Sequence, residues 1–183
     1  MGDVMNDKKK KQAKEIIAWI SCLILSLLIA LSVNRFVFTI MYIPSSSMIP
    51  TLNIGDRVIT TRTYFSRDIK RGDIVVFNPQ EDKEHEYYTK RVIGMPGDRI
   101  RIVQGDIYIN DELLNEPYVK NKGDYCGSYV VPKGKYFLLG DNRTDSLDSR
   151  FWNNPFLDIS RVKYIAQYRI YPFDKMGELT TNS

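Results

Sequence analysis

The sequence predicts a mainly β protein that begins with a single long apolar helix. Two observations support this fold class. An uncharged run of eighteen residues, Ile16–Val33, lies near the N-terminus. The rest of the chain consists of short stretches rich in Val, Ile, Tyr and Thr, separated by glycine-containing turn signals, and that pattern is typical of strands. After the apolar run we find no long stretch with apolar residues at helical spacing. A chain of 183 residues has room for one domain with a small additional lobe.

The N-terminal run has the composition of a membrane-spanning helix. It reads IIAWISCLILSLLIALSV, and its length is near the lower end of the roughly 17–25 residues that span a bilayer. Five lysines precede it within Met1–Glu15, and only Arg35 lies near its far end. The positive-inside rule therefore predicts a cytoplasmic N-terminus and places everything after Asn34 outside the cell.

Two alternatives compete with this anchor. A cleaved signal peptide has a shorter apolar core, of about 7–15 residues, but Ala30-Leu31-Ser32 does resemble a small-x-small cleavage site, so cleavage stays open. A buried helix of a soluble protein is the second alternative. Five lysines ahead of an uncharged run fit it poorly. We therefore favour an uncleaved anchor.

The expected strands follow one another along residues 57–171. Asn110-Asp111, two residue types that tolerate positive φ, predict a hairpin over Ile107–Leu113. The predicted strands are Arg57–Arg62, Ile74–Asn78, Tyr87–Ile93, Arg99–Val103, Asp106–Ile109, Ser128–Val131, Tyr136–Leu139 and Val162–Tyr171.

Composition argues against several functional classes. The net charge is only +4, and no block of five or six like charges and no nucleic-acid motif is present, so we expect no nucleic-acid partner. Cys22 lies in the apolar run and Cys126 in a polar loop, so a disulfide is implausible. Neither forms a metal-ligand cluster with the single histidine, His85, which lies in the polar run Gln80–Glu86. The sequence predicts no metal or organic cofactor.

A serine triplet, Ser45-Ser46-Ser47, follows the apolar run between two prolines. A plain linker is the simplest interpretation of such a segment. The flanking residues Ile43 and Met48 are apolar, however, and they favour a constrained loop pressed against a surface. A serine hydroxyl is a weak nucleophile until a neighbouring base takes its proton.

Lys90 lies in one of the predicted strands. Strand alternation places it on one face with Tyr88 and Val92, and places Thr89, Arg91 and Ile93 on the other. A strand lysine is usually solvated. An apolar or aromatic face would instead lower its pKa by desolvation, and a general-base lysine must be neutral.

The segment Gly140–Arg150 carries a dense set of polar residues. An acidic surface turn and a calcium loop are the simpler interpretations, but no glycine follows Asp145 and Trp152 stands where a bidentate glutamate is needed for calcium. The opposite charges of Asp148 and Arg150 suit a brace beside a reactive site.

These three segments, with Arg71–Phe77 as a fourth ordered block, resemble the type I signal peptidases from roughly Ile43 to Arg150. The resemblance implies roles for particular residues. It assigns Ser47 as nucleophile, Lys90 as general base and the Ser45 hydroxyl to the oxyanion hole with the Ser47 N–H. It further implies that Ser146 hydrogen-bonds the lysine amine, and that Asp148 and Arg150 support it. Ser46 departs from the glycine that many members carry at that position.

The resemblance also implies an architecture and a setting. It suggests a β-rich catalytic domain over residues 34–183 with a smaller inserted β lobe near Arg99–Lys135, tethered by one N-terminal transmembrane helix, as in the compact Gram-positive branch. The substrates it implies are secretory preproteins with small residues at the cleavage site. The enzyme is expected in the cell membrane, single-pass and in contact with phospholipid, with a cytoplasmic tail (residues 1–15) and an extracellular catalytic domain.

Two other functions stay open at this stage. One is a related Ser-Lys peptidase with a specialised target. The other is a membrane-tethered β domain with an inactive site that only binds a partner.

Overall fold

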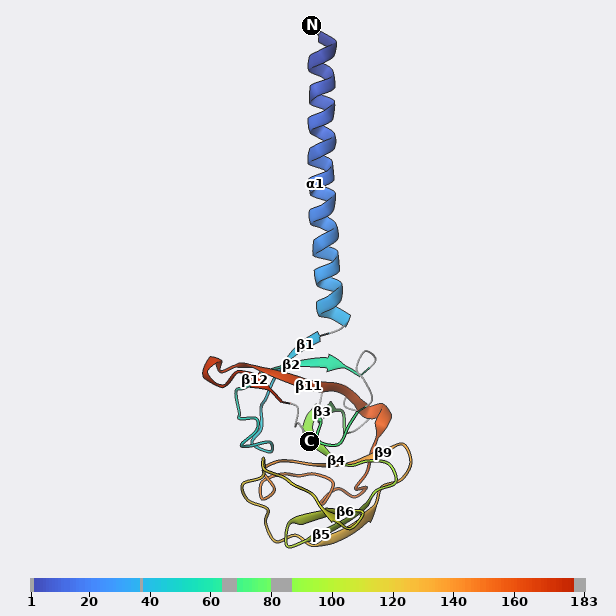
Figure 1. Cartoon of the computed structure of the whole chain (residues 1–183), viewed down its shortest axis with the longest axis vertical. Helices are drawn as coiled ribbons and strands as arrows, with labels where there is room; N and C mark the ends of the chain where they lie inside the picture. The colour runs from blue at the N-terminus through green and yellow to red at the C-terminus, as the bar shows by residue number, and fades with distance from the viewer. Residues whose placement is uncertain (1, 37, 64–68, 80–86, 180–183) are drawn as a thin grey trace. The chain divides into compact units, whose positions relative to one another are not determined.

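The structure is a computed structural model that describes residues 2–36, 38–63, 69–79 and 87–179, and within the N-terminal helix it describes side-chain surroundings for residues 12, 14–29 and 31–32. The chain divides into two compact units, Met1–Phe38 and Thr39–Ser183 (Figure 1). The predicted loop around His85 lies outside the described residues.

The first unit is the helix α1, Gly2–Phe36. No glycine or proline interrupts the sequence between residues 3 and 43, so nothing in it breaks a helix before its end. Large apolar side chains stand exposed all along it, from Ile16 (58%) and Trp19 (77%) to Leu31 (56%). Within the described residues, no helix has the length and apolarity required to cross a membrane.

The second unit is built of β-strands, so the mainly β prediction is confirmed. Its larger sheet has the strand order β1-β2-β11-β3-β4-β9-β10, with β12 paired to β11. These strands are β1 (Phe38–Tyr42), β2 (Arg57–Arg62), β3 (Ile74–Phe77), β4 (Tyr88–Gly94), β9 (Lys135–Leu139), β10 (Leu157–Asp158), β11 (Val162–Tyr171) and β12 (Gly177–Glu178).

The centre of this sheet is covered on both faces. All four residues of β3 are buried, and β3 pairs antiparallel with β4 so that Val75 lies opposite Lys90. Val75 and Phe77 belong to one apolar cluster, whereas Ile74 belongs to another, with Met48 and Leu52. A strand buried on both faces holds its neighbour's side chains in fixed, water-poor surroundings, which is what positions Lys90.

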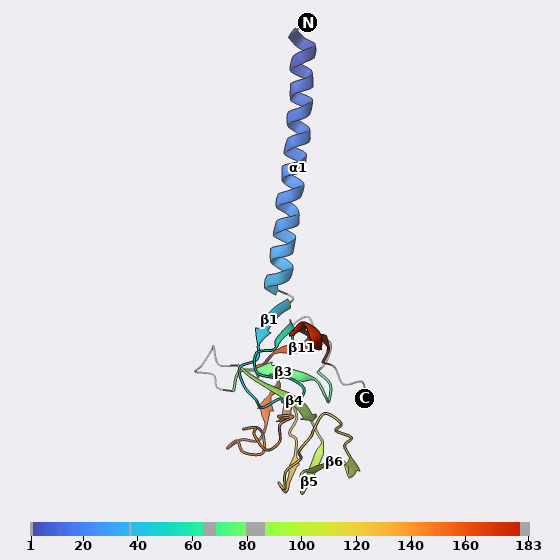
Figure 2. The ribbon, with the colours of Figure 1, turned by 90° about the vertical axis from the view of Figure 1, so that its left-hand side faces the viewer.

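Between β4 and β9 the chain forms a second, four-stranded sheet in the order β7-β6-β5-β8 (Figure 2). The predicted hairpin is present, because Asn110 and Asp111 have φ of 51° and 75° between β6 and β7. The apolar face of this second sheet packs with Ile93 and Phe137 from the larger sheet. The strands are β5 (Arg99–Val103), β6 (Asp106–Ile109), β7 (Glu112–Leu113) and β8 (Gly127–Val130).

The strands that the sequence analysis did not predict are β1, β10 and β12, whereas β7 is the second arm of the hairpin predicted over Ile107–Leu113. β10 and β12 have only two residues each, too few to show any periodicity. β1 was hidden because FTIMY continues the apolar character of α1. Two 3₁₀ turns complete the described part of this unit, η1 (Ile159–Arg161) and η2 (Phe173–Lys175).

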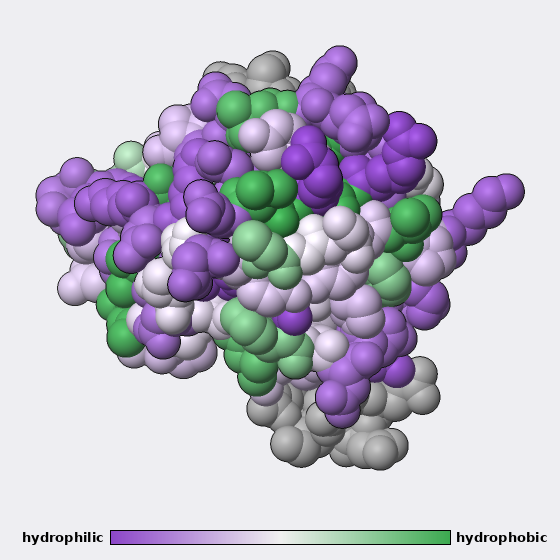
Figure 3. Space-filling view, turned by 90° about the horizontal axis from the view of Figure 1, so that it is seen from below, coloured by the Kyte–Doolittle hydropathy of each residue, from purple (hydrophilic) through white to green (hydrophobic). Residues whose placement is uncertain are grey.

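The surface of the β unit is mixed in character. On the face shown in Figure 3, green hydrophobic residues form small separate patches among purple hydrophilic ones. The site described next therefore has to be identified from its chemistry rather than from one large apolar area.

Candidate active site

The serine triplet lies in the turn-rich segment that follows β1. Ser45 is exposed, Ser47 is 8% exposed, and their hydroxyl oxygens are 3.4 Å apart. Met48 and Leu52 are fully buried and join the cluster formed by Ile43 and Val58. The apolar flanks therefore press this loop onto the sheet, as the sequence analysis expected, and leave the serines at the edge of the core.

Hydrogen bonds clamp the triplet to the loop that follows β9. The backbone N–H of Asn142 donates to the Ser47 carbonyl (3.0 Å), and its side-chain amide donates to the Ser46 carbonyl (3.1 Å). The Ser46 hydroxyl donates to the Asp145 carboxylate (2.6 Å). These three bonds hold Ser47 against the segment Gly140–Arg150.

Lys90 approaches the same segment from β4. Its side chain is 5% exposed, and the charges that influence it most are Asp148 and Arg150. Burial lowers the pKa of Lys90 to about 8, although the Asp148 carboxylate opposes the shift. A larger fraction of this amine is therefore neutral near pH 7–8 than in an ordinary lysine.

Gly140 lies where Ser47 and Ser146 meet. A methyl group in place of its hydrogen would approach both the Ser47 carbonyl and the Ser146 hydroxyl to less than 3.0 Å. The Ser146 oxygen is buried and has no hydrogen-bond partner among the described residues. No hydrogen bond joins the Lys90 amine to a described residue either, and catalytic hydrogen bonds are often long before substrate binds.

Asp148 and Arg150 form a buried pair at the end of this loop. The guanidinium donates to both carboxylate oxygens, at 2.8 and 2.9 Å, and also to the Arg143 carbonyl (2.7 Å). The Asp148 carboxylate also accepts from the backbone N–H groups of Gly140 (3.0 Å) and Arg150 (3.3 Å). The pair thus ties the two ends of the loop together.

Sequence reasoning missed a second ion pair, between Arg91 and Asp141. The Arg91 guanidinium donates to both oxygens of Asp141, at 2.8 and 2.6 Å, and the two side chains are 1% and 0% exposed. Thr51 from the serine loop also donates to Asp141. One sequence signal for the burial of Arg91 was available. Ile93 lies on the same face of the strand, and an apolar residue there indicates that this face is covered.

A third buried pair, Arg143–Glu116, was also missed. Their side chains are 2% and 1% exposed. Glu116 comes from the second-sheet region, so this pair attaches that region to the loop that follows β9. Tyr118, two residues later, lies with its ring 3.9 Å from the Arg91 guanidinium. The sequence offered no signal for either contact, because both join segments far apart in the chain.

The two cysteines have no part in the contacts described above. Cys22 and Cys126 are free and exposed. Among the described residues, no three His, Cys, Asp or Glu side chains are grouped so as to hold a metal ion.

Comparison with known proteins identifies the family. The family described as signal peptidase, peptidase S26, matches residues 16–171. The chain belongs to this family. It is 37% identical to a probable signal peptidase I-2 of Synechocystis, over 98% of this chain and 86% of that protein. It is also 36% identical to signal peptidase I T of Bacillus subtilis, over 92% of each chain.

One solved structure adds a further relative. A crystal structure of a signal peptidase I from Enterococcus faecalis is 29% identical and covers 54% of this chain and 97% of its own, with a TM-score of 0.44. That score is too low to support an argument about the fold. The sequence relationships to the signal peptidase family are sufficient on their own, and the chain is a serine endopeptidase that belongs with the enzymes removing signal peptides.

In this member of the signal peptidase family, breaking the Arg91–Asp141 pair should be strongly destabilising. Asp141→Asn leaves a buried guanidinium without its counter-charge, at a cost of about 3–5 kcal/mol. Denaturant unfolding of the purified protein measures this loss. The matched control is Asp111→Asn, which removes an exposed pair with Arg99 (side chains 75% and 68% exposed) and should change stability by less than about 0.5 kcal/mol. Equal losses in the two variants would contradict the role given to Asp141.

Lys90 itself should lower the stability of the enzyme at neutral pH. Its pKa is about 8 when folded against 10.5 as a free side chain, so the folded state binds fewer protons between these values and stability rises with pH across that window. Below pH 8 the full cost of the charged amine remains, about 3 kcal/mol. Lys90→Met should therefore unfold at higher denaturant than wild type at pH 7, with the difference closing between pH 8 and 10.5. A less stable variant at pH 7, or a pH-independent difference, would contradict the desolvated lysine.

Proposed function

We propose that the chain is a membrane-bound signal peptidase in which Ser47 is the nucleophile and Lys90 the general base. The observation that supports this most directly is the buried Lys90 amine, whose pKa is lowered to about 8 beside the loop that clamps Ser47. A neutral amine at this position can accept the serine proton at physiological pH.

The proposed reaction proceeds through an acyl-enzyme. Lys90 takes the proton of Ser47 as Oγ attacks the carbonyl carbon at the end of the signal segment. The Ser45 hydroxyl, with the Ser47 backbone N–H, donates to the oxyanion. Lys90 then returns the proton to the departing amine, and a water activated by the same lysine releases the signal peptide.

The other polar residues hold the base in place. The Ser146 hydroxyl, which has no hydrogen-bond partner in the described part of the chain, is available to hydrogen-bond the Lys90 amine once the side chains adjust to substrate. Asp148 and Arg150 keep the Ser146 loop attached to Gly140 and Arg143. Neither the formation of the acyl-enzyme nor its hydrolysis requires a metal or organic cofactor.

The substrates we propose are secretory preproteins with small residues before the cleavage site, since these are what a signal-peptide cleavage site presents. Ile16–Val33 is the proposed anchor in the phospholipid membrane, supported by its uncharged sequence and by its exposed apolar side chains. Residues 1–15 form the cytoplasmic tail, and residues 34–183 form the peptidase domain outside, with the segment around 99–135 as its inserted lobe.

The dyad is tested by turnover of a preprotein as a function of pH. Wild-type activity should rise through about pH 8 as Lys90 loses its proton. Ser47→Ala and Lys90→Ala should each abolish turnover, and the double variant should be no worse than either, because the two residues act as a unit. Lys90→Arg should be equally inactive, since a guanidinium keeps its proton.

Two further variants sharpen this test. Ser45→Ala should slow turnover by about 10²–10³-fold without abolishing it, as expected for the loss of one oxyanion donor. His85→Ala should leave turnover largely unchanged. Substantial activity of Lys90→Arg in alkaline buffer, or an inactive but folded His85→Ala, would refute the proposed dyad.

The membrane orientation is tested by protease accessibility. Protease added to intact cells stripped of their wall should digest a tag placed after Ser183 and spare a tag before Met1, because the lysines hold the tail inside. A protected C-terminal tag would overturn the orientation and leave the dyad untouched.

A further inference from the structure

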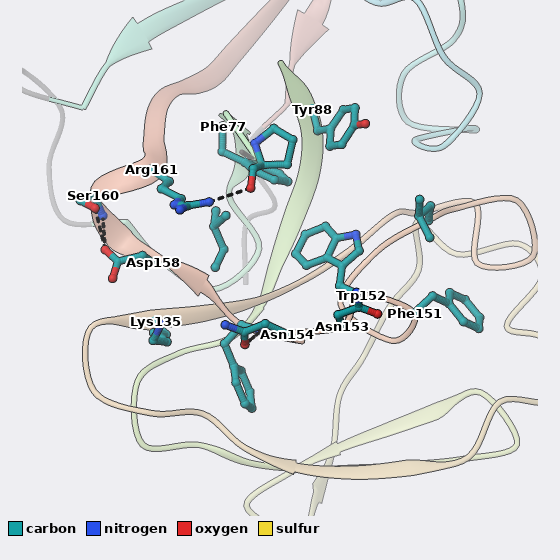
Figure 4. Close-up of a pocket in the computed structure, with 14 residues that line it drawn as sticks. Phe77, Tyr88, Lys135, Phe151, Trp152, Asn153, Asn154, Asp158, Ser160 and Arg161 are labelled. Carbon is teal, nitrogen blue, oxygen red and sulfur yellow. Dashed lines mark hydrogen bonds between the residues drawn. The ribbon is translucent and has the colours of Figure 1, made fainter. Parts of the chain in front are cut away.

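A cavity of about 580 Å³ opens beside the candidate site, around the segment that follows Arg150 (Figure 4). Its volume falls within the range of about 300–1,000 Å³ typical of ligand sites. None of the residues that line it has been given a role in the proposed reaction.

Two lining residues connect this cavity to the catalytic side chains. Tyr88 lies two residues before Lys90 on β4, so the two side chains share one face of the strand about 7 Å apart. Leu147 stands between Ser146 and Asp148 and is 64% exposed. The cavity therefore begins next to Lys90, on the face of β4 to which the lysine side chain belongs.

The place of the cavity beside Lys90 indicates which half of the substrate lies toward it. The lysine that accepts the Ser47 proton must return it to the amine of the departing chain, so that amine has to reach Lys90. The amine is the first atom of the mature protein. The exposed Ser45, in contrast, belongs to a loop that does not line the cavity. The mature segment is thus the half of the substrate that passes toward this cavity.

The lining suits a peptide of variable sequence rather than a single small residue. Its floor is aromatic, with Phe77 edge-on to Trp152 (ring centroids 5.7 Å apart) and to Tyr88 (6.2 Å). Polar side chains surround this floor in Figure 4, and three of them are charged, Lys135 and Arg161 positively and Asp158 negatively. Such a lining accepts an apolar side chain on the aromatic floor and peptide polar groups at the rim.

We propose that this cavity binds the first residues of the mature protein, on the carboxyl side of the scissile bond, with an apolar side chain on the Trp152 floor. The proposal rests on the function proposed above. It assigns Leu147 and Phe151 to the recognition of the leaving segment. They do not touch the reacting atoms.

The test compares two substrates that share one signal segment. The first continues into five mature residues that include an aromatic side chain, and the second ends in a methyl ester at the scissile position. The measured quantity is kcat/KM, because it reports the acylation step for both. Leu147→Ala and Phe151→Ala should each lower kcat/KM for the extended peptide about tenfold, equivalent to about 1.4 kcal/mol, and change the ester by less than about twofold.

Matched controls are available elsewhere on the surface. Leu113→Ala and Phe173→Ala remove equally apolar side chains that are 58% and 77% exposed and do not line the cavity, so both substrates should react as in wild type. Equal losses on the two substrates, or no loss on either, would overturn the assigned cavity while leaving the dyad standing. If wild-type enzyme cleaves the ester but not the extended peptide, the proposed function fails first.

Discussion

The arrangement of this site depends on one buried ion pair, Arg91–Asp141. Arg91 follows Lys90 on β4, Asp141 begins the loop after β9, and Thr51 belongs to the segment that carries Ser47. One carboxylate therefore joins the three segments that carry the proposed catalytic residues. Such a pair adds little net stability compared with an apolar replacement, but losing one partner is costly. Its value here is that it specifies a single relative placement of the serine, the lysine and the loop.

The same burial that requires this pair also lowers the pKa of Lys90, the proposed base. The side chains on the two faces of β4 differ in their ion pairing. Arg91 forms an ion pair with Asp141. Lys90, on the other face, has no hydrogen-bonded counter-ion among the described residues. Arg150 donates to both oxygens of Asp148, the carboxylate whose charge influences Lys90 most. The lysine is left with desolvation as its dominant influence, and its pKa falls for that reason.

A rigid site of this kind is built from both sheets. Glu116 leaves the second sheet's region to pair with Arg143, and Tyr118 packs its ring against Arg91. The second sheet thus contributes to the placement of the catalytic loop through two buried contacts, in addition to its own apolar cluster around Ile93 and Phe137. These buried polar contacts fix the positions of the side chains that they join, and an unsatisfied partner in any of them would be costly.

The sequence by itself determined the strands with clear alternation or turn chemistry, since those signals are local. Arg57–Arg62 and Arg99–Val103 occur as predicted, and Asn110-Asp111 turn the hairpin because both tolerate positive φ. It also singled out Ser47 and Lys90 as candidate site residues, because both stand beside apolar neighbours where a linker or a solvated strand would not place them. Only the tertiary structure decided that Arg91, Asp141, Thr51, Glu116 and Arg143 are buried partners. Each of these contacts joins residues at least 27 positions apart, and no local pattern encodes which distant charge a buried group will meet.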